Sequence, residues 1–299
     1  MNESEPRKPW IALGMSLVLP GFGQLYNGEL NKAIWLFLAF AFLSIPGVVL
    51  VALYLPDEWM LPALVASVFV TIALWLFGMI DAWRQARKKV DYRPEPWQMS
   101  GVYLLVLILC DVLGLPLLTG FVRTHEVESF NIPSRSMEPT VLMGDVLFAD
   151  KRYNCPGCKQ AIRRGDIAIF TYPNDRTMLY IKRVIALPGD KVELRGQEVE
   201  INGKSLAAQV GNAGVVVETE DGRSWQVQRG ASDQEGPVES LVVPPGQVFV
   251  LGDNRGASTD SRKFGTVPMQ DVVGRAQQVW FSRGPEGIRW QRFGTLLLP

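Results

Sequence analysis

The sequence predicts a chain in two parts: an N-terminal α-helical transmembrane region and a mainly antiparallel β domain with a β-ribbon excursion. Three observations lead to this fold class. Long apolar runs are concentrated in the first 122 residues. From residue 130 onward the sequence breaks into short β-type runs separated by turn residues. Between the two parts, an apolar run of membrane-spanning length ends shortly before the first β-type run.

Two apolar segments, residues 33–55 and 59–80, contain no charged side chain. Each is long enough to cross about 30 Å of hydrocarbon as a helix, so both are predicted to span a membrane. A third segment, residues 101–122, has a similar length but carries Asp111 near its middle. A charge there costs about 2.5–3.5 kcal/mol on insertion scales, so we expect Asp111 to face other helices rather than lipid.

Two interpretations of Asp111 stay open. An ionisable residue inside a membrane segment is a functional candidate by default. The alternative is a hydrogen bond to a polar residue of a neighbouring helix, for which the candidates are Ser44, Ser67 and Thr71. We favour this packing bond, because the predicted spans contain no second acidic or basic residue.

Residues 10–26 are also apolar, but Pro20-Gly21-Phe22-Gly23 interrupts the run. Because proline and glycine end helices, we expect a re-entrant or interfacial segment here rather than a further span. The wider motif Leu19-Pro20-Gly21-Phe22-Gly23-Gln24-Leu25-Tyr26-Asn27-Gly28, followed by two spans and Asp81-Ala82-Trp83, resembles a small membrane domain that occurs alone or fused to others. The role of that domain is unassigned.

Charged loops predict the orientation of the membrane part. The loop after the second span is basic and contains Arg84-Gln85-Ala86-Arg87-Lys88-Lys89, whereas the loop between the first two spans is Pro56-Asp57-Glu58. Lys and Arg accumulate in cytoplasmic loops, so the third span should leave the cytoplasm. Everything after about Arg123 is therefore predicted to lie on the outer face of the membrane.

Charge and cysteine content limit the possible partners. Lys plus Arg and Asp plus Glu each number 30, and the resulting net charge of zero argues against a nucleic-acid partner. Cys155-Pro156-Gly157-Cys158 is a single CxxC without a second pair or a nearby histidine, which argues against a zinc site. Outside the cytoplasm a hairpin disulfide is favoured, with two inert thiols as the alternative. We expect no metal and no cofactor.

The outer part is predicted to be a mostly antiparallel β domain. Asn202-Gly203 and Asp221-Gly222 are typical of two-residue hairpin turns. Residues 195–239 are richer in polar and turn residues, so we expect a β-ribbon excursion there rather than part of the core. The predicted strands are residues 146–148, 167–172, 178–185, 191–194, 199–201, 215–219, 247–251 and 276–281.

One serine and one lysine form a pattern that indicates nucleophilic catalysis. Ser136 lies in Pro133-Ser134-Arg135-Ser136-Met137-Glu138-Pro139-Thr140, and Lys182 lies in the apolar run 179–185. A serine hydroxyl is a weak nucleophile until a base takes its proton. The chain holds one histidine, His125, which we expect to be a solvated residue beyond the membrane exit. A lysine whose pKa is lowered by burial is therefore the better candidate base.

Four sequence blocks follow the membrane exit in series. They are Phe130-Asn131-Ile132-Pro133-Ser134-Arg135-Ser136-Met137-Glu138-Pro139-Thr140, Arg164-Gly165-Asp166-Ile167-Ala168-Ile169-Phe170, Tyr180-Ile181-Lys182-Arg183-Val184-Ile185-Ala186-Leu187-Pro188-Gly189-Asp190 and Gly252-Asp253-Asn254-Arg255-Gly256-Ala257-Ser258-Thr259-Asp260-Ser261-Arg262. From about residue 129 to the C-terminus the chain thus resembles bacterial type I signal peptidase, a membrane-bound Ser/Lys endopeptidase. The expected domains are a membrane domain (1–98), a transmembrane helix (99–122) and an extracytoplasmic catalytic domain with the family's β fold (123–299).

The resemblance implies an acyl transfer that passes through an acyl-enzyme. Ser136 would be the nucleophile and Lys182 the general base. The nucleophile's own backbone N–H and a serine hydroxyl would stabilise the oxyanion. The implied supporting residues are Ser134 for the oxyanion, Ser258 for orienting the lysine, Tyr180, and Asp260 with Arg262 as an ion pair.

The family removes N-terminal signal peptides from exported preproteins after Ala-x-Ala sites, because shallow apolar pockets reject large side chains. The strand 166–170 is predicted to pair with an extended substrate. The implied partners are preprotein signal peptides, the lipid bilayer and the export machinery. The implied location is the bacterial cytoplasmic (inner) membrane, crossed several times, with the catalytic domain on the outer, periplasmic face. The expected substrate-binding residues are Phe130, Ile132, Pro133, Asp166, Ile167 and Ile169.

Two positions depart from the family pattern. Arg135 stands where the family often has glycine and would place a long cation beside the cleft. Gly256-Ala257 replaces a common Asp-Asn, so the loop before Ser258 should be held differently. Two alternatives are a Ser/Lys membrane peptidase with another substrate and an inactive membrane scaffold. The joint presence of Ser136, Lys182 and Ser258 argues against the scaffold.

Overall fold

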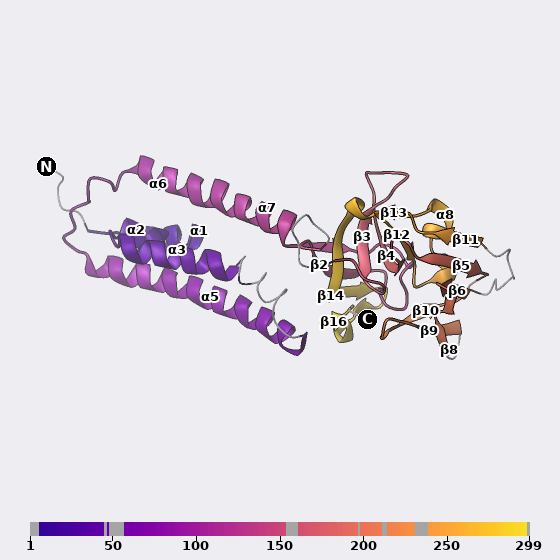
Figure 1. The fold of residues 1–299 in the computed structure, drawn as a ribbon. Coiled ribbons are helices and arrows are strands. Elements are labelled where there is room, and N and C mark those ends of the chain that lie inside the picture. The colour runs from indigo at the N-terminus through magenta and orange to yellow at the C-terminus, as the bar shows by residue number, and fades with distance from the viewer. Residues whose placement is uncertain are drawn as a thin grey trace. The chain divides into compact units, whose positions relative to one another are not determined.

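The computed structural model describes residues 6–44, 47, 57–153, 161–196, 198–210, 214–230 and 239–297. The chain divides into two compact units, Met1–Thr124 and His125–Pro299 (Figure 1). The first unit is helical, and the second consists mainly of strands. The predicted fold class, a helical N-terminal part followed by a mainly antiparallel β domain, is confirmed.

The first unit contains two helices that are long and apolar enough to cross a membrane, Pro62–Lys88 and Ser100–His125. They contain the predicted spans 59–80 (from residue 62) and 101–122. Of the predicted span 33–55, residues 45–46 and 48–55 lie outside the described residues. The helices of this unit are α1 (Pro9–Val18), α2 (Phe22–Tyr26), α3 (Leu30–Ser44), α5 (Asp57–Lys88), α6 (Ser100–Leu107), the π-helical η1 (Ile108–Gly114) and α7 (Leu115–His125).

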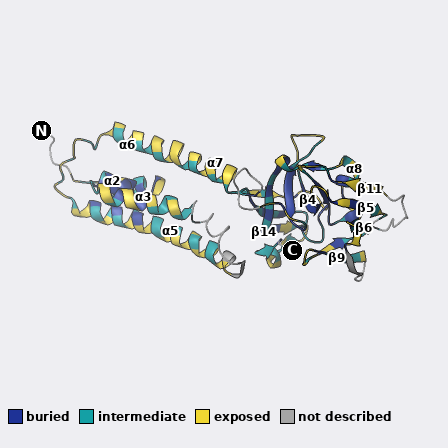
Figure 2. Ribbon diagram, in the orientation of Figure 1, coloured by how far each residue is buried: buried dark blue, intermediate teal, exposed yellow. Residues whose placement is uncertain are grey.

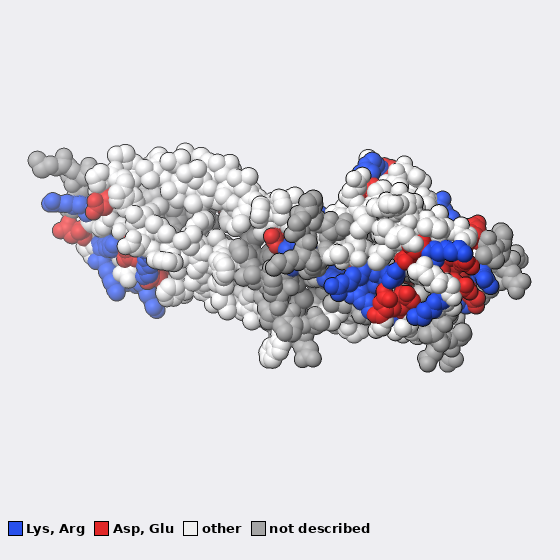
Figure 3. Space-filling view, in the orientation of Figure 1, with Lys and Arg blue, Asp and Glu red and all other residues white. Residues whose placement is uncertain are grey.

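Much of the surface of these helices is exposed and uncharged. Figure 2 shows long yellow and teal stretches along α5, α6 and α7. In Figure 3 the charged side chains of this unit gather at one end, while the visible sides of the helices are white. Apolar side chains open to solvent over such lengths indicate contact with lipid.

The segment 10–26 folds back on itself. Its beginning and its end both lie beside Lys89, because Arg7 N–H donates to the Lys89 carbonyl at 3.0 Å and Lys89 Nζ donates to the Asn27 carbonyl at 2.5 Å. Lys8 N–H also donates to the Tyr26 hydroxyl at 3.3 Å. Helix α1 has 10 residues, about 15 Å, which is half the thickness of the hydrocarbon layer. This is the form of a re-entrant hairpin, and its location within a membrane stays a prediction.

The motif from Leu19 to Gly28 attaches α2 to its neighbours. A Cβ at Gly23 would overlap the Ala12 carbonyl oxygen, so glycine alone permits this approach of α1 and α2. The buried Gln24 donates to the Gly78 carbonyl of α5 at 2.7 Å, and the buried Asn27 donates to the Ala82 carbonyl at 2.8 Å. The motif therefore supplies hydrogen bonds between helices where water is scarce.

The expectation that Asp111 faces other helices is wrong. Asp111 is exposed on the π-helical turn η1. The three suggested partners donate to carbonyls of their own helices: Ser44 to Ala41, Ser67 to Leu64 and Thr71 to Ser67. Ser and Thr hydroxyls within a helix can donate to a carbonyl of the preceding turn, and these three do so instead of bonding to Asp111.

The second unit is built around a large antiparallel sheet. Its path is β1 (Val127–Asn131), β2 (Asp145–Asp150), β14 (Val272–Gly284), β3 (Ile167–Thr171), β4 (Leu179–Ala186), β12 (Gln247–Leu251) and β13 (Val267–Pro268), with β15 (Gly287–Ile288) and β16 (Thr295–Leu296) also paired to β14. Alternate residues of β3 enter different apolar clusters, Ile167 and Ile169 one and Ala168 and Phe170 another. The short helices are η3 (Arg255–Ala257), α8 (Ser261–Phe264), η4 (Met269–Asp271) and η5 (Trp290–Arg292).

Two smaller antiparallel sheets follow β4 in sequence. One has the order β11 (Glu239–Val242), β5 (Lys191–Arg195), β6 (Glu198–Ile201) and β7 (Lys204–Ser205), and the other has the order β10 (Arg223–Gln228), β9 (Val215–Glu220) and β8 (Ala207–Val210). Both expected hairpin turns are present, with positive φ at Asn202-Gly203 and at Asp221-Gly222.

The segment 195–239 contributes more to the core than its polar composition suggested. Its buried side chains form a cluster with Ile185 of β4 and with Phe249 and Leu251 of β12. The expectation that it lies outside the core is therefore wrong, because its few buried apolar residues pack against residues of β4 and β12. They are Val199, Ile201, Leu206, Val216, Trp225 and Val227.

Candidate active site

Ser136 and Lys182 meet at the surface of the large sheet. Lys182 lies on β4, and Ser136 follows β1 in the turn that carries Ile132 to Thr140. Lys182 Nζ is 2.8 Å from Ser136 Oγ and also donates to the Ile181 carbonyl at 2.9 Å. Both side chains are buried, with 3% of Lys182 and 8% of Ser136 exposed. The structure therefore places the amine within reach of the hydroxyl proton.

Burial lowers the pKa of Lys182 to about 8, since desolvation disfavours the ammonium form. The carboxylates of Asp260 and Asp253 act in the opposite direction. Each of these carboxylates is bound by an arginine, Arg262 for Asp260 and Arg183 for Asp253. A substantial fraction of Lys182 is thus neutral just above neutral pH, as a general base requires.

Two further residues of the predicted site border this pair. Ser134 Oγ lies 3.2 Å from Ser136 Oγ. The ring of Tyr180 lies 5.3 Å from Lys182 Nζ and stacks on Tyr172 with ring centroids 4.2 Å apart. Tyr180 therefore lies beside the amine, with its ring fixed by Tyr172.

The fourth sequence block supplies the other side of the site. Arg262 donates to both carboxylate oxygens of Asp260 at 2.8 Å, and Asp260 also accepts from the Gly252 N–H at 3.0 Å. Burial alone would raise the pKa of Asp260, but these donors hold it below its usual range. Ser258 is buried near this carboxylate, and its hydroxyl makes no hydrogen bond of ordinary geometry within the described residues.

A cleft of about 370 Å³ opens beside the pair. Four of the expected substrate-binding residues line it: Phe130, Ile132, Pro133 and Ile169. The other lining residues are Asn131, Ser134, Ser136, Met178, Leu179, Tyr180, Ile181, Lys182, Ala257 and Thr259. The cleft is therefore mostly apolar, with the serine and lysine at its base.

Asp166 and Ile167 are not among the residues that line the cleft, and their assignment to substrate binding stays a prediction. Asp166 is fully buried and accepts from the Tyr153 hydroxyl at 2.8 Å and from Arg223 at 2.9 Å. Ile167 is buried in the core.

The predicted pairing of substrate with residues 166–170 is wrong. Strand β3 is hydrogen-bonded on one side to β14 and on the other to β4. An open edge lies instead on β4, because β12 pairs with residues 183–186 and no described strand continues along residues 179–182 on that side. Residues 179–182 line the cleft.

Sequence analysis missed a buried ion pair that joins the blocks. Arg183 and Asp253 side chains are each 1% exposed, and Asp253 accepts from Arg183 at 2.6 and 2.8 Å. Thr140 donates to the same carboxylate at 2.5 Å, and Arg183 donates to the Gly165 carbonyl at 2.7 Å. One pair thus connects all four blocks. The sequence contained one indication of this pair: Arg183 is a second charged residue, directly after Lys182, in an otherwise apolar strand.

The departures from the family pattern leave the cleft intact. The side chain of Arg135 is 67% exposed, lies 3.9 Å from Glu138 and is not among the lining residues. The expected cation beside the cleft is therefore absent from its lining. Ala257 lines the cleft, and its N–H donates to Asn254 Oδ1 at 3.2 Å. Cys155 and Cys158, for which a disulfide was expected, lie outside the described residues.

The chain matches known proteins over part of its length. The profile of the family described as signal peptidase, peptidase S26, matches residues 103–281. Signal peptidase I of Rickettsia typhi is 34% identical over 196 residues, which are 54% of this chain and 74% of that protein. Signal peptidase I of Pseudomonas fluorescens is 33% identical over 189 residues, 54% and 66% of the two chains. The crystal structure of a signal peptidase I from Enterococcus faecalis is 33% identical, covers 38% of this chain and 95% of its own, and has a TM-score of 0.26.

Replacing Gly252 with alanine is expected to lower activity at least about tenfold and the free energy of unfolding by about 1–3 kcal/mol. A Cβ at this position would overlap the Ser258 hydroxyl and lie 2.5 Å from the Ser136 carbonyl oxygen, so both serines must move. Kinetics and denaturant unfolding of the purified variant measure the two effects. Wild-type values for both would contradict this account of the loop.

Replacing Lys182 with methionine is expected to stabilise the protein by about 2–3 kcal/mol at pH 7. The pKa of Lys182 falls from 10.5 to about 8 on folding, so below pH 8 the folded chain carries a charge that its surroundings disfavour. The unfolded state binds more protons between pH 8 and 10.5, so wild-type stability rises there and the gain from methionine disappears. Denaturant unfolding at pH 7 and 10 checks this, with the exposed Lys263→Met as the control. An equal effect of both variants would refute it.

Proposed function

The chain belongs to the signal peptidase family, peptidase S26, and we propose that it removes signal peptides from exported preproteins with Ser136 as nucleophile and Lys182 as general base. The observation that carries this assignment is the 2.8 Å approach of a buried amine to a serine hydroxyl at the base of an apolar cleft. The membership makes the chain a serine endopeptidase. The residue roles are our proposal.

In the first half of the reaction neutral Lys182 accepts the hydroxyl proton while Ser136 Oγ bonds to the scissile carbonyl carbon. The carbonyl oxygen becomes an oxyanion in the tetrahedral intermediate. This intermediate then breaks the C–N bond, and the Lys182 ammonium returns the proton to the leaving amine. The products are the mature protein and a Ser136 ester of the signal peptide.

In the second half Lys182, neutral again, takes a proton from water, and the hydroxide bonds to the ester carbon. The second tetrahedral intermediate expels Ser136 Oγ, which recovers its proton from Lys182. Both intermediates need donors already in place at the oxyanion. The Ser134 hydroxyl, 3.2 Å from Ser136 Oγ, and the Ser136 N–H are the proposed donors.

The substrate backbone is proposed to pair with the open edge of β4 at residues 179–182. This edge lines the cleft and leads directly to Lys182. Ile132 and Ile169 lie in the wall of the cleft, where branched side chains leave room for small substrate residues only. An Ala-x-Ala site meets this limit, because every second residue of an extended peptide faces the same wall.

The helical unit is proposed to cross the cytoplasmic membrane several times, with its basic end in the cytoplasm and the catalytic unit on the outer face. The support is the gathering of Arg84, Arg87, Lys88 and Lys89 at the end of α5, together with two helices of spanning length. Signal peptides emerging from the export machinery would then reach the cleft from the bilayer.

Purified enzyme in detergent is expected to cut a preprotein after the second alanine of its Ala-x-Ala site. The Ser136→Ala and Lys182→Ala variants should each lose about 10³-fold or more in kcat/KM. Because the base must be neutral, kcat/KM should rise with pH through a midpoint near the Lys182 pKa of about 8 and level off above it. Mass spectrometry identifies the cut, and Lys263→Ala is the matched lysine control. Full activity of either active-site variant would overturn the residue roles.

Cysteine labelling is expected to place Lys88 and Lys263 on opposite sides of the membrane. In a background with Cys110, Cys155 and Cys158 replaced by serine, a membrane-impermeant maleimide should label Lys263→Cys in intact spheroplasts. It should label Lys88→Cys only after the membrane is permeabilised. Labelling of Lys88→Cys in intact spheroplasts would reverse the proposed orientation.

A further inference from the structure

We propose that Glu218, which lies outside the four sequence blocks, is a positioning residue for catalysis and acts through Arg255 on the loop 252–258. This inference rests on the proposed function, because that loop carries Ser258 and supports Ser136. It assigns to the β9–β10 hairpin a role in the reaction, in addition to its part in the core.

The pair formed by Glu218 and Arg255 is buried almost completely. Arg255 Nη2 donates to Glu218 Oε2 at 2.5 Å, and each side chain is 2% exposed. The Trp225 Nε1–H of β10 donates to the same carboxylate oxygen at 3.0 Å. The carboxylate is thus fixed by its own hairpin, and the arginine is fixed by the carboxylate.

Arg255 transmits this fixed position to the loop. Its Nε donates to the Gly252 carbonyl at 3.2 Å, and its own carbonyl accepts from Arg262 Nη2 at 2.8 Å. Arg262 is the residue that holds Asp260. Arg255 therefore joins the beginning of the loop, through its side chain, to the ion pair that follows it, through its backbone carbonyl.

The loop in turn holds the proposed nucleophile. Asn254 N–H donates to the Ser136 carbonyl at 3.1 Å, and Asn254 Nδ2 donates to the Arg135 carbonyl at 3.2 Å. Gly252 lies so close to Ser258 Oγ and the Ser136 carbonyl oxygen that no side chain would fit there. A displacement of this loop therefore moves both serines.

A second attachment comes from the same hairpin. Gln228 N–H, at the end of β10, donates to the Asp253 carbonyl at 2.7 Å, and Gln228 forms a parallel bridge with Asn254. The backbone contacts of Gln228 keep the β9–β10 hairpin beside the loop 252–258. The Glu218–Arg255 pair then fixes the position of the loop relative to the hairpin. Because Glu218, Gln228 and Arg255 are not among the residues that line the cleft, they can change the chemical step without forming a substrate contact.

Removing the Glu218 carboxylate leaves a buried guanidinium without its charged partner. Arg255 Nη1 already makes no hydrogen bond within the described residues, so Arg255 has no spare partner at hand. A buried cation in this condition moves toward water, and the loop attached to it must follow. A misplacement of about 1 Å at a reacting group can lower the rate by up to about a hundredfold.

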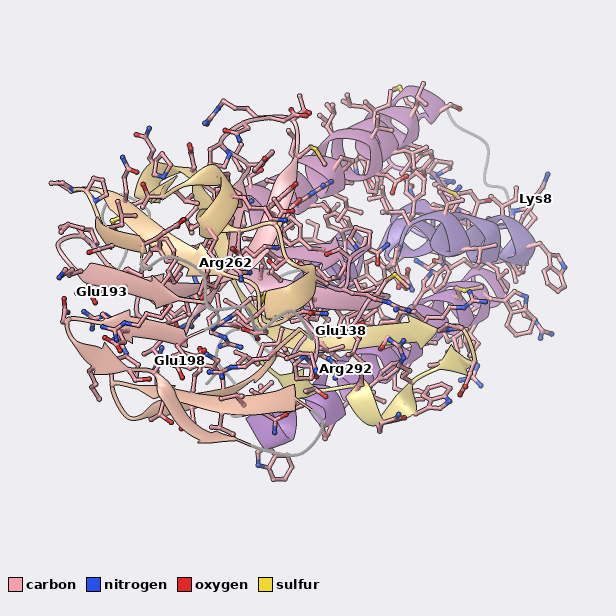
Figure 4. The ribbon with its side chains drawn as sticks, turned by 90° about the vertical axis from the view of Figure 1, so that its right-hand side faces the viewer. Lys8, Glu138, Glu193, Glu198, Arg262 and Arg292 are labelled. Carbon is pink, nitrogen blue, oxygen red and sulfur yellow. The ribbon has the colours of Figure 1, made fainter. Side chains whose placement is uncertain are left out.

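The test compares kcat and KM of the full-length Glu218→Ala and Glu218→Gln variants in detergent, at a temperature where both are fully folded by circular dichroism. We expect kcat to fall at least about tenfold in Glu218→Ala, with KM within about threefold of wild type. Glu218→Gln keeps an acceptor for Arg255 and Trp225, so its kcat should lie between that of Glu218→Ala and that of the wild type. The control is Glu193→Ala, on the outer part of the β5 sheet and apart from Arg262 in Figure 4.

An unchanged kcat in folded Glu218→Ala would overturn the inference, as would a loss of stability alone. If Glu218→Ala does not fold, an unchanged kcat in Glu218→Gln would overturn it in the same way. Ser136→Ala separates this failure from that of the proposed function. An active Ser136→Ala faults the proposed function, whereas an inactive Ser136→Ala beside an unchanged Glu218 series faults only the role of Glu218.

Discussion

The second unit depends on keeping the amine of Lys182 out of water while it stays next to Ser136. Here desolvation is the effect that lowers the pKa of the lysine toward neutral pH, where the amine can act as a base. Two carboxylates, Asp253 and Asp260, lie close enough to oppose this effect. Each is bound to an arginine, so much of its charge is compensated before it acts on the lysine. The ion pairs are therefore a condition for the proposed chemistry as well as a support for the fold.

The same ion pairs explain why residues from distant parts of the chain converge. A buried charge is stable only with its partner, so Arg183 in the interior of β4 and Asp253 after β12 fix these two strands against each other. Asp166 has a similar effect, since it binds Tyr153, which follows β2, and Arg223 of β10. In the helical unit, the buried side chains of Gln24 and Asn27 are likewise stabilised by partners, since each donates a hydrogen bond to a carbonyl of α5.

The sequence was informative where the signal is local. Turn pairs such as Asn202-Gly203 require positive φ, and strand periodicity follows from side-chain alternation, so hairpins and most strands could be predicted. The proximity of Ser136 and Lys182 could be predicted because their motifs resemble those of a known family. Strand neighbours are set by contacts between remote residues, so nothing local revealed that β3 has both edges occupied. The burial of Asp166 and the partners of Arg183 were hidden for the same reason.

The open edge of β4 has a consequence for the range of substrates. Backbone N–H and C=O groups are the same in every peptide, so pairing with residues 179–182 would accept unrelated sequences equally well. Discrimination must then come from exclusion, through side chains such as Ile132 and Ile169 that leave little space. If substrates bind as proposed, the enzyme would tolerate changes in the sequences of its substrates, provided that small residues occupy the two positions facing the wall. The edge is also too short to recruit strands from other folded proteins, which limits unwanted association.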